Sequence, residues 1–284
     1  MDPEVLTAST EIREDDRRAP PVITPTFLLV TLANFGYFIT IGMIIPALPR
    51  FVEGPLGLGN AMVGVAVGAF SFAAVVTYPF AGRLGDARGR RLLIVAGGVL
   101  VAGSVGLQVI ATSIVPLVLC RLVMGMGGAC FYVGVASTIN DLAPDERRAE
   151  ALSYFSIALY AGLGAGPVVG ELILEGGSFD RVWVVAAAAS LIAALAGVLV
   201  PETRPPDRSP VSNPRLWHRG AVLPGIVLAT SVIGLAGFNS FVPLYALDLG
   251  MDGARIVFVA YAVVVLLLRS AGARIPDRFG PSRT

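Results

Sequence analysis

The sequence predicts an all-α integral membrane protein in which six helices precede a polar segment and two follow it. Three observations support this fold class. Hydrophobic residues make up 55% of the 284 residues and charged residues only 14%, whereas a soluble domain carries about a quarter charged residues. Apolar stretches long enough to cross a bilayer recur along the whole chain. The segments between them are polar and rich in arginine.

Residues 1–25 are mostly polar and of mixed charge, without the apolar core and cleavage site of a signal peptide, so we expect a cytoplasmic tail. The segment 201–220 is rich in proline and arginine and should form a linker. The predicted domains are a six-helix half over 26–201, a linker over 202–220 and a partial second half over 221–284. The eight predicted spans are 26–48, 61–82, 92–112, 115–138, 151–173, 182–201, 221–246 and 254–271.

The arginines predict the orientation of these spans, because basic residues are retained on the cytoplasmic side of a membrane. With the N-terminus inside, sixteen arginines of the tails and connectors fall on the cytoplasmic side and three on the opposite side. We therefore expect both termini in the cytoplasm and the protein in the inner membrane. The three arginines on the opposite side are Arg50, Arg181 and Arg255.

Several other classes of protein are not indicated. The net charge of +1 gives no electrostatic basis for binding nucleic acid. The sole histidine, His218, makes a histidine-based metal site improbable, and no phosphate-binding loop or nucleophile–base pair suggests an enzyme. Cys120 and Cys130 lie about 15 Å apart along one helix, too far for a disulfide. We expect no bound cofactor.

Two connectors at equivalent places resemble each other: GRLGDARGRR (82–91) follows the second span, and ARIPDRFGPS (273–282) follows the eighth. This similarity indicates two related halves, as in many transporters, the second being incomplete. An ungapped alignment gives three identical pairs: Arg83 with Arg274, Asp86 with Asp277, and Gly89 with Gly280.

The first connector resembles the signature between the second and third helices of the major facilitator superfamily. That signature runs Gly, any, Leu, small, Asp, basic, any, Gly, basic, basic, and here only Ala87 departs from it. The resemblance implies a major facilitator-type bundle, in which two halves rock about a site near the bilayer midplane. The matching residues are Gly82, Leu84, Asp86, Gly89, Arg90 and Arg91.

The resemblance implies a conformational gate built from Gly82, Asp86, Gly89, Arg90 and Arg91. Glycine at 82 would allow a close helix contact, and Asp86 would bind a helix N-terminus or pair with the arginines. In the family this aspartate meets the eleventh helix, which the sequence lacks. A repeat gate would comprise Asp277, Arg278 and Gly280, with Asp277 near the start of the fifth helix. The alternative is that the arginines anchor only the topology.

The stretch CRLVMGMGGA (120–129) resembles the fourth-helix pattern of the family, with Arg121, Gly125 and Gly127 in place. A charge inside a span costs about 2.5–3.5 kcal/mol and therefore faces the protein interior or water. The resemblance implies that Arg121 is a coupling residue. The alternative is an arginine that only packs against backbone carbonyls.

The stretch GLGAGPVVGE (162–171) resembles the fifth-helix pattern of drug–proton antiporters in the family. Gly162, Gly166, Pro167 and Gly170 fit this pattern, while Glu171 stands where glycine is expected. The resemblance favours export over uptake. The alternative is a tight helix contact without any role in export.

Proton coupling requires a carboxyl group that can titrate, and the first span carries Asn34 but no acid. Glu171 and Asp248 lie toward the outer ends of the fifth and seventh spans, and the alternative for each is an interfacial position. Of the two, Glu171 is the candidate coupling carboxylate; an essential acid in the missing part of the second half is a further alternative. The family analogy also indicates which helices line the substrate cavity. The candidate residues on those helices carry no net negative charge, which argues against an exporter dedicated to organic cations. The candidates are Asn34, Tyr37, Arg121, Phe238 and Asn239.

The expected function is proton-coupled efflux of small amphipathic molecules by alternating access, driven by the proton gradient. Ion-coupled uptake of a sugar or metabolite is the alternative among transporters. A truncated, non-transporting product or a membrane partner of another chain is the alternative outside that class. The sequence leaves the substrate and oligomeric state open. The stretch PET at 201–203, which ends the sixth span, is expected to carry little chemistry.

Overall fold

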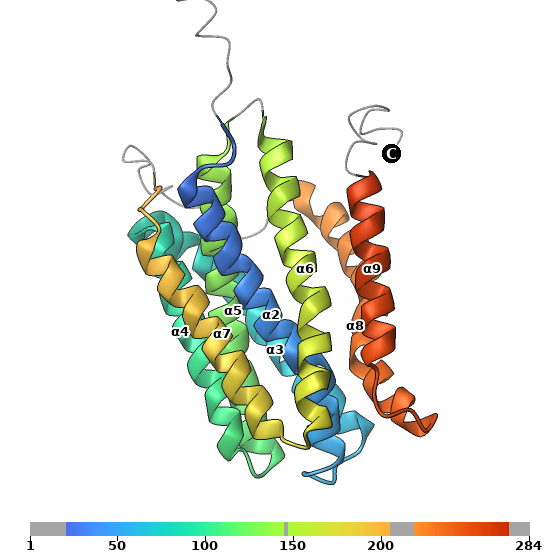
Figure 1. The fold of residues 1–284 in the computed structure, drawn as a ribbon. Helices are drawn as coiled ribbons and strands as arrows, with labels where there is room; N and C mark the ends of the chain where they lie inside the picture. Colours follow the sequence, from blue (N-terminus) through green and yellow to red (C-terminus); the bar gives the residue numbers. More distant parts are fainter. Residues whose placement is uncertain (1–20, 145–146, 205–218, 273–284) are drawn as a thin grey trace, which may run out of the picture.

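The computed structural model describes residues 21–144, 147–204 and 219–272, and these residues form helices joined by short connections (Figure 1). Each predicted span coincides with a helix, so the all-α membrane fold is confirmed. The third span is completed by a short 3₁₀ helix, η1 (Leu107–Ile110). The α-helices are α2 (Pro25–Glu53), α3 (Asn60–Arg88), α4 (Arg90–Gly106), α5 (Ile114–Leu142), α6 (Arg148–Glu175), α7 (Phe179–Leu199), α8 (Arg219–Asp248) and α9 (Arg255–Gly272).

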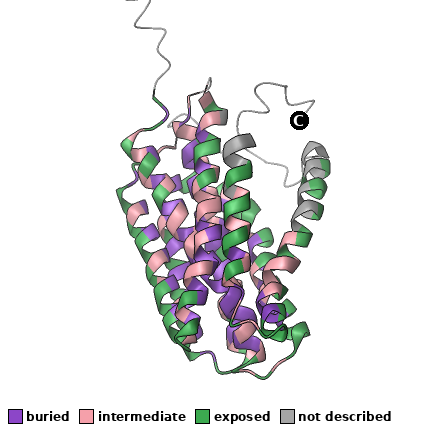
Figure 2. Cartoon of the chain, turned by 45° about the vertical axis from the view of Figure 1, so that its right-hand side comes forward, coloured by how far each residue is buried: buried purple, intermediate pink, exposed green. Residues whose placement is uncertain are grey.

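The described part of the chain contains six helical segments that are long and apolar enough to cross a membrane, from Pro25–Glu53 through Phe179–Leu199. Their outward faces carry large apolar side chains such as Phe72, Ile110 and Leu199. In water such a surface would be unfavourable, whereas lipid tails solvate it. Figure 2 shows buried residues gathered inside the bundle and exposed residues on its outer faces.

Close backbone contacts hold the six-helix group together, because lipid-exposed helices gain little from the hydrophobic effect and associate through tight packing. A Cβ placed on Gly42 of α2 would lie 2.7 Å from the Cα of Gly166 in α6. A Cβ on Gly97 of α4 would lie 2.6 Å from the carbonyl oxygen of Gly127 in α5. At these points the helices approach with no side chain between them.

Helices α8 and α9 pack against α2 and α6 of this group. A separate apolar cluster forms where the end of α8 and the start of α9 meet these two helices, around Ala246, Ala254 and Phe258. Ile45 of α2 and Val168 of α6 complete the cluster. This contact lies at the lower end of the molecule in Figure 1, opposite the end of α7 and the start of α4.

The segment 82–91 is not the polar loop that the sequence predicted. Residues 82–88 continue α3 through its last two turns, and only Gly89 separates α3 from α4. The connector is therefore a sharp corner between two helices. The seventh predicted span agrees with α8, which is continuous although it contains Pro224, Gly237 and Pro243.

Candidate functional site

The corner between α3 and α4 requires glycine at position 89. Gly89 adopts a φ of 103°, which L side chains rarely tolerate, and its N–H donates to the carbonyl of Gly85. A Cβ at this position would also overlap the carboxylate of Glu202. The backbone conformation and the neighbouring side chain both exclude a larger residue.

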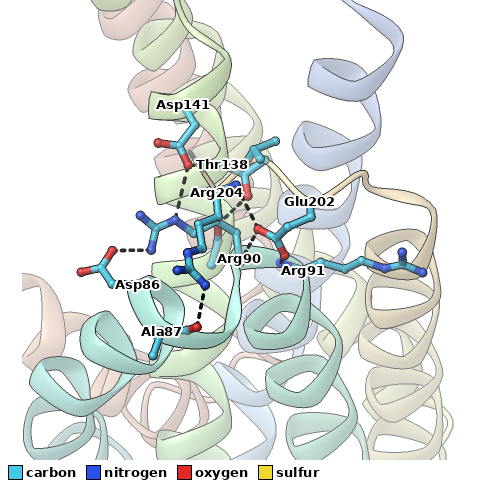
Figure 3. A network of polar contacts seen from close by, with 10 residues as sticks. Asp86, Ala87, Arg90, Arg91, Thr138, Asp141, Glu202 and Arg204 are labelled. Carbon is cyan, nitrogen blue, oxygen red and sulfur yellow. Dashed lines mark hydrogen bonds and ion pairs between the residues drawn. The ribbon is translucent and has the colours of Figure 1, made fainter. Parts of the chain in front are cut away.

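The buried side chain of Arg90 links α3, α4 and α5. Its Nη1 lies 2.8 Å from Asp86 Oδ1, and its Nε donates to Asp141 Oδ2 at 3.3 Å (Figure 3). Asp141 is largely enclosed, with 14% of its side chain exposed, whereas Asp86 is 55% exposed. Arg90 is therefore bound by two carboxylates. Asp86 is the more exposed of the two and has room to accept further hydrogen bonds.

Glu202, three residues beyond the end of α7, caps the N-terminus of α4. Its carboxylate accepts from the backbone N–H of Arg90 at 2.8 Å and from that of Arg91 at 3.2 Å. The first N–H groups of a helix have no partner within it, and a negative charge there is favourable. Gly89 has no side chain to serve as the cap, so a residue far away in the sequence supplies it.

Burial alone would raise the pKa of Glu202, but hydrogen bonds from the backbone N–H groups of Arg90, Arg204 and Arg91 hold it below its ordinary value. The charged carboxylate is thus the form that this site stabilises.

The residues next to Glu202 extend the same contact. Thr203 Oγ1 donates to Asp141 Oδ2 at 3.3 Å, and Arg204 Nη1 donates to the carbonyl of Ala87 at 2.6 Å. We call the residues joined in this way the junction network: Asp86, Ala87, Arg90, Arg91, Asp141, Glu202, Thr203 and Arg204.

Glu202–Arg204 therefore pack with the α3–α4 corner, although they lie in a segment predicted to carry little chemistry. The available signal was an acidic residue just beyond an apolar helix, at the membrane face where the arginines concentrate. It could not identify the partner, which lies more than a hundred positions earlier.

Two predicted features of the gate have no described partner. A Cβ on Gly82 would meet no atom within 4 Å in the described part of the chain, so the expected close approach at Gly82 is not made there. The repeat gate residues Asp277, Arg278 and Gly280 lie outside the described residues.

Arg121 is buried inside the six-helix group. Its Nε donates to the carbonyl of Ala66 at 3.1 Å, its Nη1 lies 3.2 Å from Met124 Sδ, and its guanidinium carbon lies 5.0 Å from the centre of the Phe70 ring. No carboxylate partner of Arg121 occurs among the described residues. The carbonyl contact proposed as the alternative is thus present, and it satisfies only part of a group with five N–H donors.

The glycines of the fifth-helix pattern all face α2. A Cβ on Gly162 would lie 2.8 Å from the carbonyl oxygen of Phe35, and one on Gly170 would lie 2.6 Å from that of Met43. Gly166 contacts Gly42 directly, and Pro167 lies beside it, with its Cδ 2.8 Å from a Cβ built on Gly42. These residues bring two helices of the same half together.

The candidates for the substrate cavity occupy two different places. Asn34 has no exposed surface, and Tyr37 stacks on Phe131 with ring centres 4.6 Å apart, so neither lines an open cavity in this conformation. Phe238 instead packs against Phe258 of α9 at the contact between α8–α9 and the six-helix group, and its neighbour Asn239 is half-buried.

Glu171 lies at the same contact. Its side chain is only 1% exposed, and Oε2 lies 2.9 Å from Nη1 of Arg50 in α2. Oε1 accepts from the backbone N–H of Ala254, at the start of α9, at 3.2 Å. Glu171 is thus buried between α2, α6 and the start of α9, and its depth in the membrane stays a prediction. Among residues 21–144, 147–204 and 219–272, no group of three or more His, Cys, Asp or Glu side chains is placed to hold a metal ion.

Comparison with known proteins adds sequence evidence to this geometry. The family model described as Major Facilitator Superfamily matches residues 30–284. The chain is 31% identical over 232 residues to multidrug resistance protein 1 of Bacillus subtilis, a match that covers 78% of this chain and 58% of the relative. It is 28% identical over 224 residues to quinolone resistance protein NorA of Staphylococcus aureus, covering 75% and 56% respectively. The chain spans little more than half the length of these relatives.

Solved structures share the fold. The human organic anion transporter MFSD10 (TETRAN) superposes with a TM-score of 0.68 at 17% identity, over 92% of this chain and 74% of that one. A bacterial homolog of the human lysosomal transporter Spinster, inward-facing and occupied, superposes with a TM-score of 0.68 at 18% identity, over 90% and 62%. At this identity the likeness concerns the fold alone.

Proposed function

Because the chain belongs to the major facilitator superfamily and is a multi-pass membrane transporter rather than an enzyme, we propose that it carries out proton-coupled efflux of small amphipathic molecules. The movement would be alternating access across the bacterial inner membrane, with both termini in the cytoplasm. The observation that carries this proposal is its similarity to two drug-resistance proteins over three quarters of its length.

The geometry supports a gating role for the junction network. Arg90 and Glu202 fasten the ends of α3, α4, α5 and α7 into one rigid corner. Asp86 stands at its edge with an exposed carboxylate, and the adjoining face of α3 leaves Gly64, Gly68 and Gly82 without a neighbour in the described chain. A helix from another part of the transporter could pack on this face in one conformation and leave it in the other.

The test is export from cells that express the longest reading frame containing this chain. Cells should accumulate less of an amphipathic dye and tolerate more of a drug such as a quinolone than cells with an empty vector. Dissipation of the proton gradient should abolish the difference. Efflux that persists without a gradient would contradict proton coupling, and unchanged accumulation of every compound in a broad panel would contradict efflux.

A second candidate is a membrane component that needs a complementing segment before it can transport. It is favoured by one observation, namely that the chain spans 56–58% of the curated relatives' length. Expression of residues 1–284 alone, beside the longest reading frame, separates the two. Equal export by both forms would exclude the need for a further segment.

A further inference from the structure

A buried polar bridge joins the six-helix group to α9 at the end of the molecule opposite the junction network. Glu171 of α6 binds Arg50 of α2 through one carboxylate oxygen and the backbone N–H of Ala254 through the other. We call Arg50, Glu171 and Ala254 the latch. Gly253 leaves room for it, since a Cβ at 253 would lie 2.5 Å from Glu171 Oε2.

The latch depends on a departure from the resembling fifth-helix pattern, which has glycine at the position that Glu171 occupies. A glycine there could bind neither Arg50 nor α9. The carboxylate therefore adds a bond between the two groups of helices at a place where close packing alone would otherwise operate.

Among the charged groups at this contact, Glu171 should contribute most to holding the helices together. The charged side chains that face it are Arg50 from α2, Glu175 from its own helix and Arg255 from α9. Glu175 and Arg255 form their own pair at 2.7 Å, with 42% and 43% of their side chains exposed. Such an exposed pair contributes about 0–1 kcal/mol, whereas a buried charge that loses its partner is strongly destabilising.

The latch must break if the transporter alternates. The apolar cluster around Ala246, Ala254 and Phe258 lies beside it and holds the same helices together without charge. Opening this end separates α9 from α2 and α6, and Glu171 then loses the N–H of Ala254. Separation is unfavourable while the carboxylate is ionised and bound, and less so once a proton neutralises it, because the neutral acid attracts Arg50 and the helix N-terminus more weakly.

We propose that Glu171 is a proton-sensitive latch of this transporter: it holds this end of the bundle closed as a carboxylate, and it releases α9 when it is protonated. The inference rests on the proposed function and adds a group through which protons control the opening of this end. Glu171 acts through the position of α9 and is thus a positioning residue, since no contact with substrate is required of it.

The experiment measures the opening of this end without measuring transport. Spin labels are placed on cysteines introduced at Asn60, the first residue of α3, and at Leu249, directly after α8, both of which are exposed. The background carries Cys120→Ala and Cys130→Ala, the protein comes from the longest reading frame, and it is reconstituted in lipid nanodiscs. Inter-label distances are recorded by pulsed electron paramagnetic resonance at about pH 8 and about pH 5.

At about pH 8 the unmodified latch should give mainly the short distance, and acid should raise the population at longer distance about fivefold or more, the lower range of allosteric coupling. Glu171→Gln, which imitates the neutral acid, should show the longer distance at both pH values. Arg50→Gln should lengthen the distance at about pH 8. Glu175→Gln is the matched control, because it removes a carboxylate on the same helix that forms only an exposed pair, and its distances should follow those of the unmodified protein.

A distance distribution that Glu171→Gln leaves unchanged would overturn the proposal. So would an acid response that persists in Glu171→Gln, since another group would then take up the proton. If Glu171→Gln does not fold, the distances of the unmodified protein and of Arg50→Gln still test the proposal. The latch is refuted if acid lengthens the distance in neither protein. Export is assayed separately: an intact distance response without export would refute the proposed function and leave the latch standing.

Discussion

The carboxylate of Glu202 accepts a hydrogen bond from the backbone N–H of Arg90 at 2.8 Å, although 112 positions separate the two residues. The same oxygen accepts from the backbone N–H of Arg204, and the other oxygen accepts from that of Arg91. This contact fixes the segment after α7 to the first turn of α4. The stability of the junction network should therefore depend on Glu202 as much as on the arginines of the signature.

Replacement of Glu202 by alanine should remove the cap of α4. A lost N-terminal cap costs about 1 kcal/mol, so the thermal midpoint of the purified protein should fall. Glu202→Gln should cost less, because the amide oxygen still accepts a backbone N–H. Glu53→Gln, at the far end of α2, serves as the control. An unchanged midpoint for Glu202→Ala would show that the carboxylate does not support the helix.

Acid should weaken the same contact. The folded protein holds the pKa of Glu202 below its unfolded value, since the backbone donors outweigh the effect of burial. The contribution of Glu202 is therefore complete above the unfolded pKa of about 4.3 and is lost as the pH falls through the folded value. The gap in thermal midpoint between the unmodified protein and Glu202→Gln should narrow between about pH 6 and about pH 3. A gap that is constant with pH would contradict this assignment.

Asp86 and Asp141 bind the same guanidinium, yet their replacement should have different effects. Asp141 is enclosed, so Asp141→Asn leaves Arg90 poorly compensated and should reduce stability by about 1–3 kcal/mol. Asp86 is more than half exposed, so Asp86→Asn should cost less than about 1 kcal/mol. Under the proposed gate, Asp86→Asn should instead reduce export per folded molecule. The measurements are the thermal midpoint of each variant and its dye efflux, with efflux normalised to the amount of protein in the membrane. Equal loss of stability in Asp86→Asn and Asp141→Asn would refute the predicted difference.

The fold could be predicted from the sequence, because the length of each apolar stretch is a local property of the chain. All eight predicted spans appear as helices, and the glycines of 162–170 carried enough information to predict a tight helix contact. The partners of polar groups were not predictable in the same way. Glu202 binds Arg90, and Glu171 binds Arg50 and α9, across separations of more than eighty positions. Such contacts depend on which helix ends meet in space, and no local pattern encodes that.

The residues that line the substrate cavity are also difficult to predict from local sequence, but for another reason. Tyr37 was expected to face the cavity because of its helix, but Gly128 leaves room for its hydroxyl and Phe131 stacks on its ring, so it is enclosed. The side of a helix on which a residue lies depends on the packing of small and large neighbours. The family analogy indicates the helix, and in this conformation Tyr37 lies on an enclosed side of it.

Arg121 should be sensitive to replacement by lysine, although the charge is kept. The guanidinium donates to the carbonyl of Ala66 while it lies over the ring of Phe70, and a single ammonium group cannot reproduce this planar arrangement. If Arg121 takes part in coupling, Arg121→Lys should reduce proton-driven efflux by about tenfold, the factor that corresponds to 1.4 kcal/mol. Efflux is compared at equal amounts of folded protein, and an equal rate per molecule would assign Arg121 to packing alone.

The contact between Gly42 and Gly166 provides the sharpest test of the packing. A methyl group on Gly166 would lie 2.6 Å from the Cα of Gly42, and backbone rather than a flexible side chain would have to move. Overpacking of this kind costs about 1–3 kcal/mol, so Gly166→Ala should lower the thermal midpoint, and Gly42→Ala should do the same from the other side.

Gly103 of α4 is the matched control for this pair. A Cβ there meets no atom within 4 Å in the described chain, so Gly103→Ala adds the same methyl group to a helix without a clash. Because alanine is favoured over glycine within helices, this variant should keep or raise the midpoint. The double variant Gly42→Ala/Gly166→Ala should lose less than the sum of the single losses, since one separation of α2 from α6 relieves both clashes. Additive losses would contradict this shared contact, because they would mean that the two glycines pack against different neighbours.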